Sequence, residues 1–254
     1  MKALPHILLP VALTLGALAL PLNAAHAAGG AYQVDTAEVS EAGKCKVEGW
    51  VSGASNRDGF SAVAPACVVD VFRPVEVSTQ FNRARASDAW ASGATPKLKT
   101  NLIPTAIGAW GIAASTQASY DLSTGYNTAL YATAPATLRL NDTARINLNA
   151  GWQWDRLLDR HDLTYGAGFD LRTPNNVWIL TGEIFGQLAA TRAAIVIDEA
   201  PPAVTIVEPR AQLGLRWRPV DAFGMDLIYG RNLQGENANG ITLVTTVRFE
   251  VGKK

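Results

Sequence analysis

Residues 144–155 read ARINLNAGWQWD, and the alternation of apolar and polar side chains in this stretch decides the fold class. Every even position, from Ala144 through Leu148 to Trp154, is apolar, whereas the odd positions carry Arg, Asn, Gly, Gln and Asp. Successive side chains of a β-strand point to opposite faces of the sheet. A period of two over so many residues therefore predicts a long amphipathic strand and excludes a helix.

The same alternation recurs over residues 162–172 and 240–251. Carried along the chain, it predicts twelve strands that begin near residues 43, 59, 75, 95, 106, 125, 144, 162, 177, 207, 223 and 240. The predicted strands are long enough to span a membrane. A membrane-spanning strand has about 9–11 tilted residues, whereas a strand in a soluble protein typically has about 5–6.

Short connections between these strands alternate with longer ones. The short connections contain 73–74, 103–104, 141–142, 173–176 and 220–222, and the longer ones cover 52–59, 85–95, 119–126, 156–161, 188–207 and 232–239. Tight turns at one end and elaborated loops at the other are typical of outer-membrane barrels. We therefore expect an all-β fold, a single antiparallel up-and-down transmembrane β-barrel of about 12 strands, with both ends of the chain in the periplasm.

The N-terminus has the features of a secretory signal peptide. A charge at Lys2 precedes an apolar stretch over residues 7–22, and Ala25-His26-Ala27 supplies the small-x-small cleavage pattern. A retained membrane anchor is the alternative. We expect residues 1–27 to be the signal peptide, 28–42 a short periplasmic N-terminal segment and 43–254 the barrel, located in the outer membrane of a Gram-negative cell.

Composition excludes several classes of function. The 22 Lys and Arg balance 22 Asp and Glu, so nucleic acid lacks its electrostatic attraction and is not an expected partner. Of three histidines, only His161 lies beyond the expected cleavage site, which leaves too few imidazoles for a histidine-rich metal site. We expect no cofactor, no metal and no catalytic residue.

Alternation alone leaves open which face of the sheet points inward. A lipocalin-like soluble barrel would turn the apolar face inward, and Gly108-Ala109-Trp110 imitates a lipocalin signal, although far from the N-terminus. In a membrane barrel the polar face lines a watery lumen. The lumen-lining residues expected on that face are Lys97, Lys99, Arg139, Arg145, Asp155, Asp170, Arg172, Glu183, Arg210, Arg216, Asp226 and Arg248.

The two cysteines, Cys45 and Cys67, are symmetric about Asn56, which lies in the loop between the first two predicted strands. They are therefore expected to be cross-strand neighbours on the apolar side, joined by a disulfide in an oxidising compartment. In the loop-entropy description, such a bond contributes roughly 3 kcal/mol.

Tryptophans and prolines mark special positions in the strands. Trp50, Trp154, Trp178 and Trp217 lie toward strand ends, where amphipathic rings suit the boundary of a membrane. Prolines interrupt the alternation, and each is expected at a bulge or strand end because it lacks a ladder N–H. Such a proline has two interpretations. It is either a tolerated kink or a weak point at which the barrel wall opens sideways. The prolines in question are Pro65, Pro135 and Pro209.

Several short motifs together resemble a known family, the outer-membrane barrels named for the meta-pathway of phenol degradation. In order, these motifs are Val34-Asp35-Thr36, Gly43-Lys44, Val47-Glu48, residues 148–152 (LNAGW), 181–186 (TGEIFG), 213–217 (LGLRW) and 226–230 (DLIYG). The resemblance implies a transporter or channel for small, often aromatic or hydrophobic compounds, with Glu183 and Arg216 in the lumen. The cysteine pair departs from the family pattern.

The sequence thus favours passive passage of a small-molecule solute through a narrow polar lumen. Outer-membrane lipid and the barrel-insertion machinery are the other expected partners, the latter reading Phe249 near a C-terminus that ends in Gly252-Lys253-Lys254. A surface-binding or structural barrel is the alternative, with the insertion at 188–207 either projecting outward or plugging the lumen. A lipid hydrolase is a weaker alternative, since its only candidate base is His161.

Overall fold

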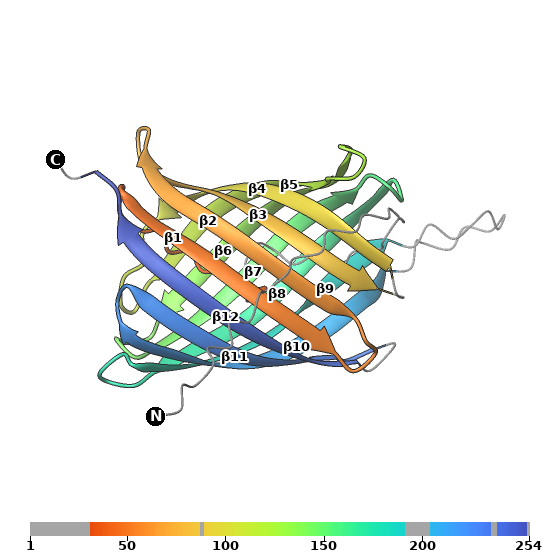
Figure 1. Ribbon diagram of the computed structural model, residues 1–254. Helices are drawn as coiled ribbons and strands as arrows, with labels where there is room; N and C mark the ends of the chain where they lie inside the picture. Colours follow the sequence, from red (N-terminus) through yellow and green to blue (C-terminus); the bar gives the residue numbers. More distant parts are fainter. Residues whose placement is uncertain (1–30, 87–88, 191–203, 235–237, 253–254) are drawn as a thin grey trace, which may run out of the picture.

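Twelve antiparallel strands close into one barrel in the computed structural model of the protein, which describes residues 31–86, 89–190, 204–234 and 238–252. Each strand pairs with its neighbours in sequence, and β1 pairs with β12 to close the sheet (Figure 1). Within these ranges, no helix is long and apolar enough to cross a membrane. The strands are β1 Lys44–Ala54, β2 Gly59–Asp70, β3 Pro74–Ala86, β4 Ala89–Ile103, β5 Trp110–Asp121, β6 Asn127–Arg139, β7 Ala144–Asp155, β8 Arg160–Arg172, β9 Trp178–Ala190, β10 Val204–Val220, β11 Phe223–Asn232 and β12 Asn239–Glu250.

The predicted fold class and strand number are confirmed. Two strand starts differ from the prediction by four residues or more, and the others lie within three residues of it. β4 begins at Ala89 rather than near 95, because small residues at its start hide the alternation. β5 begins at Trp110 rather than near 106, because Gly108 adopts a φ of +75° and closes a turn. In that turn the Ala109 N–H donates to the Ala106 carbonyl at 3.1 Å. A residue with a side chain would be strained at this φ.

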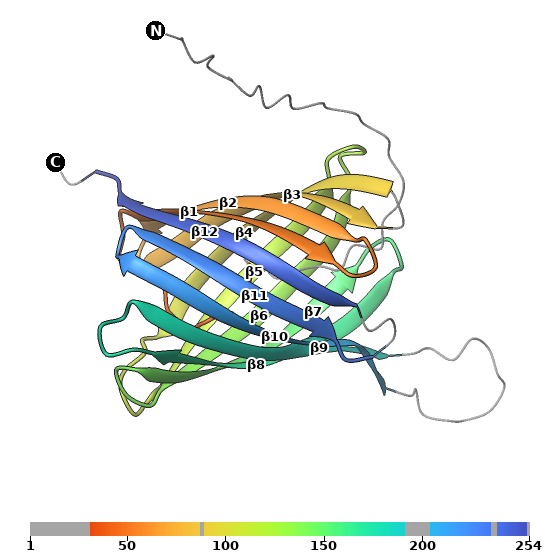
Figure 2. The same cartoon turned by 60° about the horizontal axis from the view of Figure 1, so that its bottom comes forward.

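The barrel has two ends, which we call proximal and distal. β1 begins and β12 ends at the proximal end, on the left in Figure 2. The predicted contrast between short proximal turns and long distal loops is wrong in part: the 104–109 connection at the proximal end is longer than 55–58 or 156–159 at the distal end. The strands extend into the expected loops. The insertion at 191–203 lies outside the described residues.

Apolar side chains cover the outside of the barrel, and polar side chains fill its inside. Leu148 and Phe169 are 40% and 38% exposed, whereas the adjacent Asn147 and Asp170 are each 3% exposed. The orientation expected of a membrane barrel is therefore the observed one, and the lipocalin-like alternative is excluded. A surface this apolar, closed so that no strand edge is free, suits a lipid environment.

Aromatic rings gather on the outer surface near both ends. At the proximal end, Trp217 lies 6.4 Å from both Trp178 and Phe223, measured between ring centroids. At the distal end, His161 stacks on Trp152 and Trp154 at 5.4 and 5.7 Å. Such belts are expected at the two boundaries of a bilayer.

Trp50 does not belong to these belts. Its side chain is 5% exposed and lies in an apolar cluster with Ala31, Ile228 and Val244. The prediction for Trp50 was wrong because its even position in β1 turns the ring into the bore, whichever end of the strand it is near.

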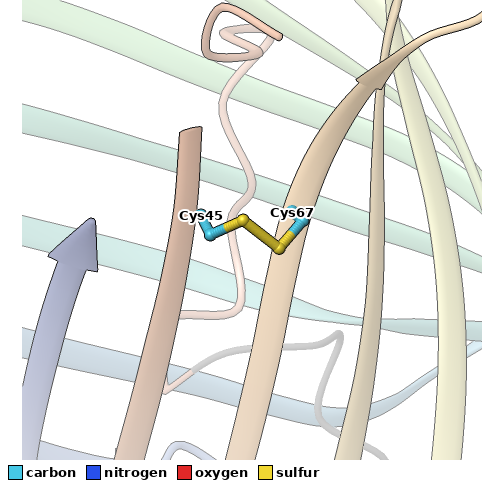
Figure 3. The surroundings of a disulfide bond; sticks show 2 residues. All are labelled: Cys45 and Cys67. Carbon is cyan, nitrogen blue, oxygen red and sulfur yellow. A yellow bond between two sulfur atoms is a disulfide. The ribbon is translucent and has the colours of Figure 1, made fainter. Parts of the chain in front are cut away.

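A disulfide joins Cys45 and Cys67, as predicted (Figure 3). The two residues are directly opposed in the β1–β2 pairing, and their Cα atoms lie 4.1 Å apart. The bond therefore cross-links the two strands of the first hairpin near the proximal end of the barrel.

Only one of the three prolines lies at a bulge. The register between β9 and β10 shifts between Val207 and Arg210, around Pro209. Pro65 and Pro135 instead leave the register of their strands unshifted. The β2–β3 and β5–β6 ladders skip the pairs at these residues, because a proline removes one hydrogen bond without requiring an extra residue.

Because the apolar side chains point outward, a charge introduced on that face should destabilise the barrel more in the middle of a strand than near its end. Leu148 lies in the middle of β7, so Leu148→Arg should destabilise the barrel in lipid vesicles by ~2–4 kcal/mol. Leu171 lies at the proximal end of β8, and Leu171→Arg should cost only ~0–1 kcal/mol. Urea unfolding followed by heat-modifiable gel migration measures both. Equal costs at the two positions would contradict the proposed placement of the barrel in the bilayer.

Candidate functional site

Residues 31–38, which precede β1, run inside the bore. We call them the plug segment. The sequence predicts a short periplasmic segment over 28–42, but Val34 and Ala37 are 4% and 0% exposed and contact strands from across the barrel. The segment enters the bore because its polar groups find partners on the inward face of the strands. The expected signal peptide, residues 1–27, lies outside the described residues.

The strongest attachment of the plug segment is one carboxylate held by two lysines. Asp35 Oδ2 accepts from Lys97 Nζ and Asp35 Oδ1 from Lys99 Nζ, each at 2.7 Å. Burial by itself would raise the pKa of Asp35, but the two ammonium groups outweigh it and hold the pKa well below its usual range. The carboxylate is therefore charged, and it compensates two lysines that are buried at 8% and 4% exposure.

Backbone groups of the plug segment are also hydrogen bonded to the barrel wall. The Gln33 N–H donates to Glu183 Oε2 at 2.9 Å, and the Ala37 N–H donates to Thr137 Oγ1 at 2.8 Å. Because β6 and β9 supply these acceptors, the segment is tied to the wall from more than one side. Buried backbone donors without such partners would be costly.

Tyr32 fixes the start of the plug segment against β10 and β11. Its hydroxyl donates to Asp226 Oδ1 at 3.0 Å, and the Arg216 guanidinium lies 5.2 Å above its ring. Burial, with Asp226 beside it, raises the pKa of Tyr32, so the hydroxyl stays protonated and remains a donor. A Cβ on Gly214 would lie 2.1 Å from the Tyr32 hydroxyl oxygen, so only glycine leaves room for the ring there.

Two of the cavities in the bore lie toward its opposite ends. The distal cavity has a volume of about 330 Å³ and is lined by Ala31, Trp50, Phe60 and Arg210 among others. The proximal cavity has a volume of about 920 Å³ and a mostly charged lining. Residues of the plug segment line both cavities, so the segment is the barrier between them.

The structure places the residues predicted to line the lumen in three groups. Six contact the plug segment: Lys97, Lys99, Arg145, Glu183, Arg216 and Asp226. Asp170, Arg139, Arg172 and Arg248 line the proximal cavity, and Arg210 lines the distal one. Asp155 instead accepts the Leu157 and Leu158 N–H groups and caps the distal turn.

Sequence reasoning missed the side chains that the plug segment itself contributes. Tyr32, Asp35 and Glu38 are central to the contacts within the bore, and Glu38 pairs with Arg145. They precede the first strand, so no alternation marks them. One signal was present: Gly214 and Gly166 take the place of inward side chains, and Gly166 would meet Val34 Cγ2 at 2.9 Å if it carried a Cβ.

The part of the chain that the structure covers contains no group of three or more His, Cys, Asp or Glu side chains placed to hold a metal ion. The chemistry of the bore is that of paired and unpaired charges.

Comparison with known proteins gives a family and a fold. A family model described as uncharacterised conserved protein UCP029691 matches residues 16–249. No curated protein matches the sequence.

Three solved structures of outer-membrane proteins share the fold. The KdgM porin is 8% identical with a TM-score of 0.59, covering 81% of this chain and 99% of its own. The NanC porin is 6% identical with a TM-score of 0.61, covering 79% and 98%. The COG4313 outer membrane channel from Pseudomonas putida F1 is 12% identical with a TM-score of 0.58, covering 84% and 98%. At these identities the likeness shows the outer-membrane barrel fold.

Loss of the Asp35 charge should release the plug segment while the barrel stays folded. In Asp35→Asn, amide exchange at Gln33 and Ala37 should accelerate about tenfold or more, because each charge-assisted hydrogen bond contributes about 1.5–3 kcal/mol. Hydrogen exchange with mass spectrometry measures this, and strand amides such as that of Leu148 serve as the internal reference. Asp58→Asn, in an exposed distal turn, is the matched control. Unchanged exchange at Gln33 in Asp35→Asn would contradict the role assigned to this carboxylate.

The lowered pKa of Asp35 makes the attachment insensitive to mild acid. A carboxylate whose pKa is depressed contributes fully above its ordinary value near ~3.9 and loses the contribution only as the pH falls toward the depressed pKa. Protection of the Ala37 amide, which donates to the Thr137 hydroxyl, should therefore be the same at neutral pH and at a pH of about 5 once it is corrected for intrinsic exchange. A loss of protection over this range would show that the pKa of Asp35 is instead raised above its ordinary value.

Proposed function

The chain belongs to the family UCP029691, and we propose that it is an outer-membrane channel through which small solutes diffuse passively. In the proposed resting state, the plug segment restricts passage. The observation that carries the proposal is the pair of cavities that lie toward opposite ends of a closed barrel and are separated by eight residues. A structural barrel has no need of a cavity on either side of a segment that is attached by individual hydrogen bonds and ion pairs.

The plug segment limits what passes. Its contacts are individual hydrogen bonds and ion pairs between side chains and backbone, and residues 31–38 contain no strand that joins the sheet. Such contacts can be exchanged for contacts with water or a solute at modest cost. A twelve-stranded barrel encloses only a narrow lumen, so a displaced segment opens a selective path rather than a broad pore.

A solute with a small ring is the proposed cargo. The sequence resembles the barrels of the phenol meta-pathway, and the distal cavity offers aromatic surface from Trp50, Phe60 and Phe185 beside Arg210. Aromatic rings bind other rings through apolar contact and edge or offset stacking. The predicted signal peptide, the Gram-negative outer membrane and insertion by the barrel-insertion machinery complete the proposal.

The lipid-hydrolase alternative finds little support at its only candidate base. His161 is exposed on the outer surface and stacks on Trp152 and Trp154, in the distal aromatic belt. A histidine that serves as general base is instead hydrogen bonded to a nucleophile and an orienting acid. The surface-binding alternative depends on the insertion at 191–203, outside the described residues.

Removal of the plug segment should raise conductance. In planar bilayers, deletion of residues 31–38 should increase single-channel conductance about twofold or more, because the two cavities then join along the narrow bore. Asp35→Asn should raise the frequency of the same large openings without deletion of any residue. Asp159→Asn, in an exposed distal turn that lines neither cavity, is the control and should behave as wild type. Absence of current from wild type and from both plug variants would refute the channel function.

A further inference from the structure

We propose that the proximal cavity contains a binding site for the oxyanion group of a small organic solute, formed by Arg172, Arg218 and Arg248. The inference deepens the proposed channel function and rests on it, because the site would select which solutes cross the bore.

The lining of the proximal cavity is cationic although the whole chain is neutral. Nine Lys and Arg side chains line it against six Asp and Glu side chains, whereas the chain as a whole has 22 of each. The excess is concentrated on one side of the bore, where β8, β10 and β12 present Arg172, Arg218 and Arg248. A positive excess inside a low-dielectric wall attracts anions more strongly than the same charges would in open water.

Two of these arginines have no acidic partner. Neither Arg172 nor Arg248 has a carboxylate within ion-pair distance among the residues that the structure describes, although other cations of the bore do. Among the described carboxylates, Arg218 pairs with Asp221 alone, at 3.4 Å, and the Asp221 side chain is 98% exposed to solvent. An ion pair so exposed contributes little. The three guanidinium groups are therefore available to a ligand.

Two donor atoms in the cluster are buried without a hydrogen-bond partner. Arg218 Nε and Arg248 Nη1 have essentially no exposed area, and neither atom bonds to any described part of the protein. A buried charged donor that stays unsatisfied costs free energy, so such groups commonly mark places where a ligand or water completes the site.

Two arginines of the cluster, Arg218 and Arg248, lie close together next to Gly224. A Cβ on Gly224 would lie 3.8 Å from Arg248 Nη1 and 3.9 Å from Arg218 Cγ, so both arginines lie over this residue. Arg172 is in electrostatic reach of Arg218 and of Arg145. Like charges brought so close repel one another, and a bound anion would remove that repulsion.

Nearby carboxylates are committed elsewhere. Glu38 and Asp170 both bind Arg145, and Asp226 binds Arg216 at 2.7 Å. Glu48 is within electrostatic reach of Arg248 but accepts the Ala31 N–H at 3.3 Å, which ties it to the start of the plug segment. The cluster therefore has a net positive charge after the ion pairs of these carboxylates are taken into account.

An oxyanion fits this cluster better than a simple halide. The guanidinium group presents planar, paired N–H donors that match two oxygens of a carboxylate or phosphate. A cavity of about 920 Å³ has room for a solute of several carbon atoms beside that group. Carboxylate and phosphate share this chemistry, so the test distinguishes them.

Equilibrium dialysis of the detergent-solubilised full chain tests the site. Labelled benzoate should bind and uncharged benzamide should not, because only the former carries an oxyanion. Arg172→Gln and Arg248→Gln should each weaken benzoate binding about tenfold, the usual effect of one lost charge-assisted contact. Arg248→Lys should give a smaller loss, since it keeps the charge but not the paired donors. Competition by inorganic phosphate tells whether the oxyanion alone is recognised.

Arg73→Gln is the matched control, because Arg73 lines the same cavity from the turn between β2 and β3 but lies outside the cluster. It removes the same charge and should change benzoate binding less than about twofold. Heat-modifiable migration verifies that each variant is folded. Equal binding of benzamide, no benzoate binding to wild type, or an equal loss in Arg73→Gln would each overturn the proposal.

Measurements of current and of benzoate binding on the same protein distinguish failure of the proposed site from failure of the channel function. Current in planar bilayers together with no benzoate binding would refute the site and leave the channel intact. Cluster-dependent benzoate binding without any current would refute passive passage and leave the site intact. Current that benzoate reduces in wild type but not in Arg172→Gln supports both.

Discussion

Closure of the sheet is the constraint on which the rest of this structure depends. In hydrocarbon, every backbone N–H and C=O must find a partner within the protein, and a β-sheet achieves this only when its first and last strands pair. The β1–β12 pairing meets that requirement. Once the sheet is closed, the pleat assigns alternate side chains to lipid and to the bore. The charges of the chain are thereby brought into one confined space, in which they must be paired, hydrated or left for a ligand.

The way this space is filled explains the plug segment. A narrow bore that contains many long cationic side chains is unfavourable unless acids are present to compensate them. The strands supply some of these acids, including Asp170 and Asp226, and the chain before β1 supplies Asp35 and Glu38. The plug segment is therefore a set of counter-charges as much as a steric obstacle. Its contacts are strong locally, but they are of the kind that a charged solute can replace.

Compensation is uneven along the bore, and this unevenness gives the two cavities different chemistry. The distal cavity combines aromatic surface with Arg210, whereas the proximal cavity contains arginines that have no acidic partner in the described part of the chain. A solute with a ring and an oxyanion would find a suitable surface on either side of the plug segment. Selectivity in such a channel would come from the order in which the two parts of a solute meet these surfaces, and not from pore diameter alone.

The sequence by itself determined the strands, the disulfide and the fact that charges such as Lys97 and Arg216 share one face of the sheet, because each follows from a period of two and from pairing between neighbours in the chain. Which face points into the bore was decided by the closed barrel. It could not determine where residues 31–38 lie, since a segment without alternation carries no orientation. It also assigned Trp50 to the membrane boundary, because that assignment used the position of Trp50 toward a strand end and not the face on which its even position places the ring. Only the closed tertiary structure brought Asp35 to Lys97 and Lys99, more than sixty positions away, and left Arg172 and Arg248 without a carboxylate partner among the described residues. Those contacts depend on which side chains share one confined bore, a property of the whole barrel and of no single stretch of the chain.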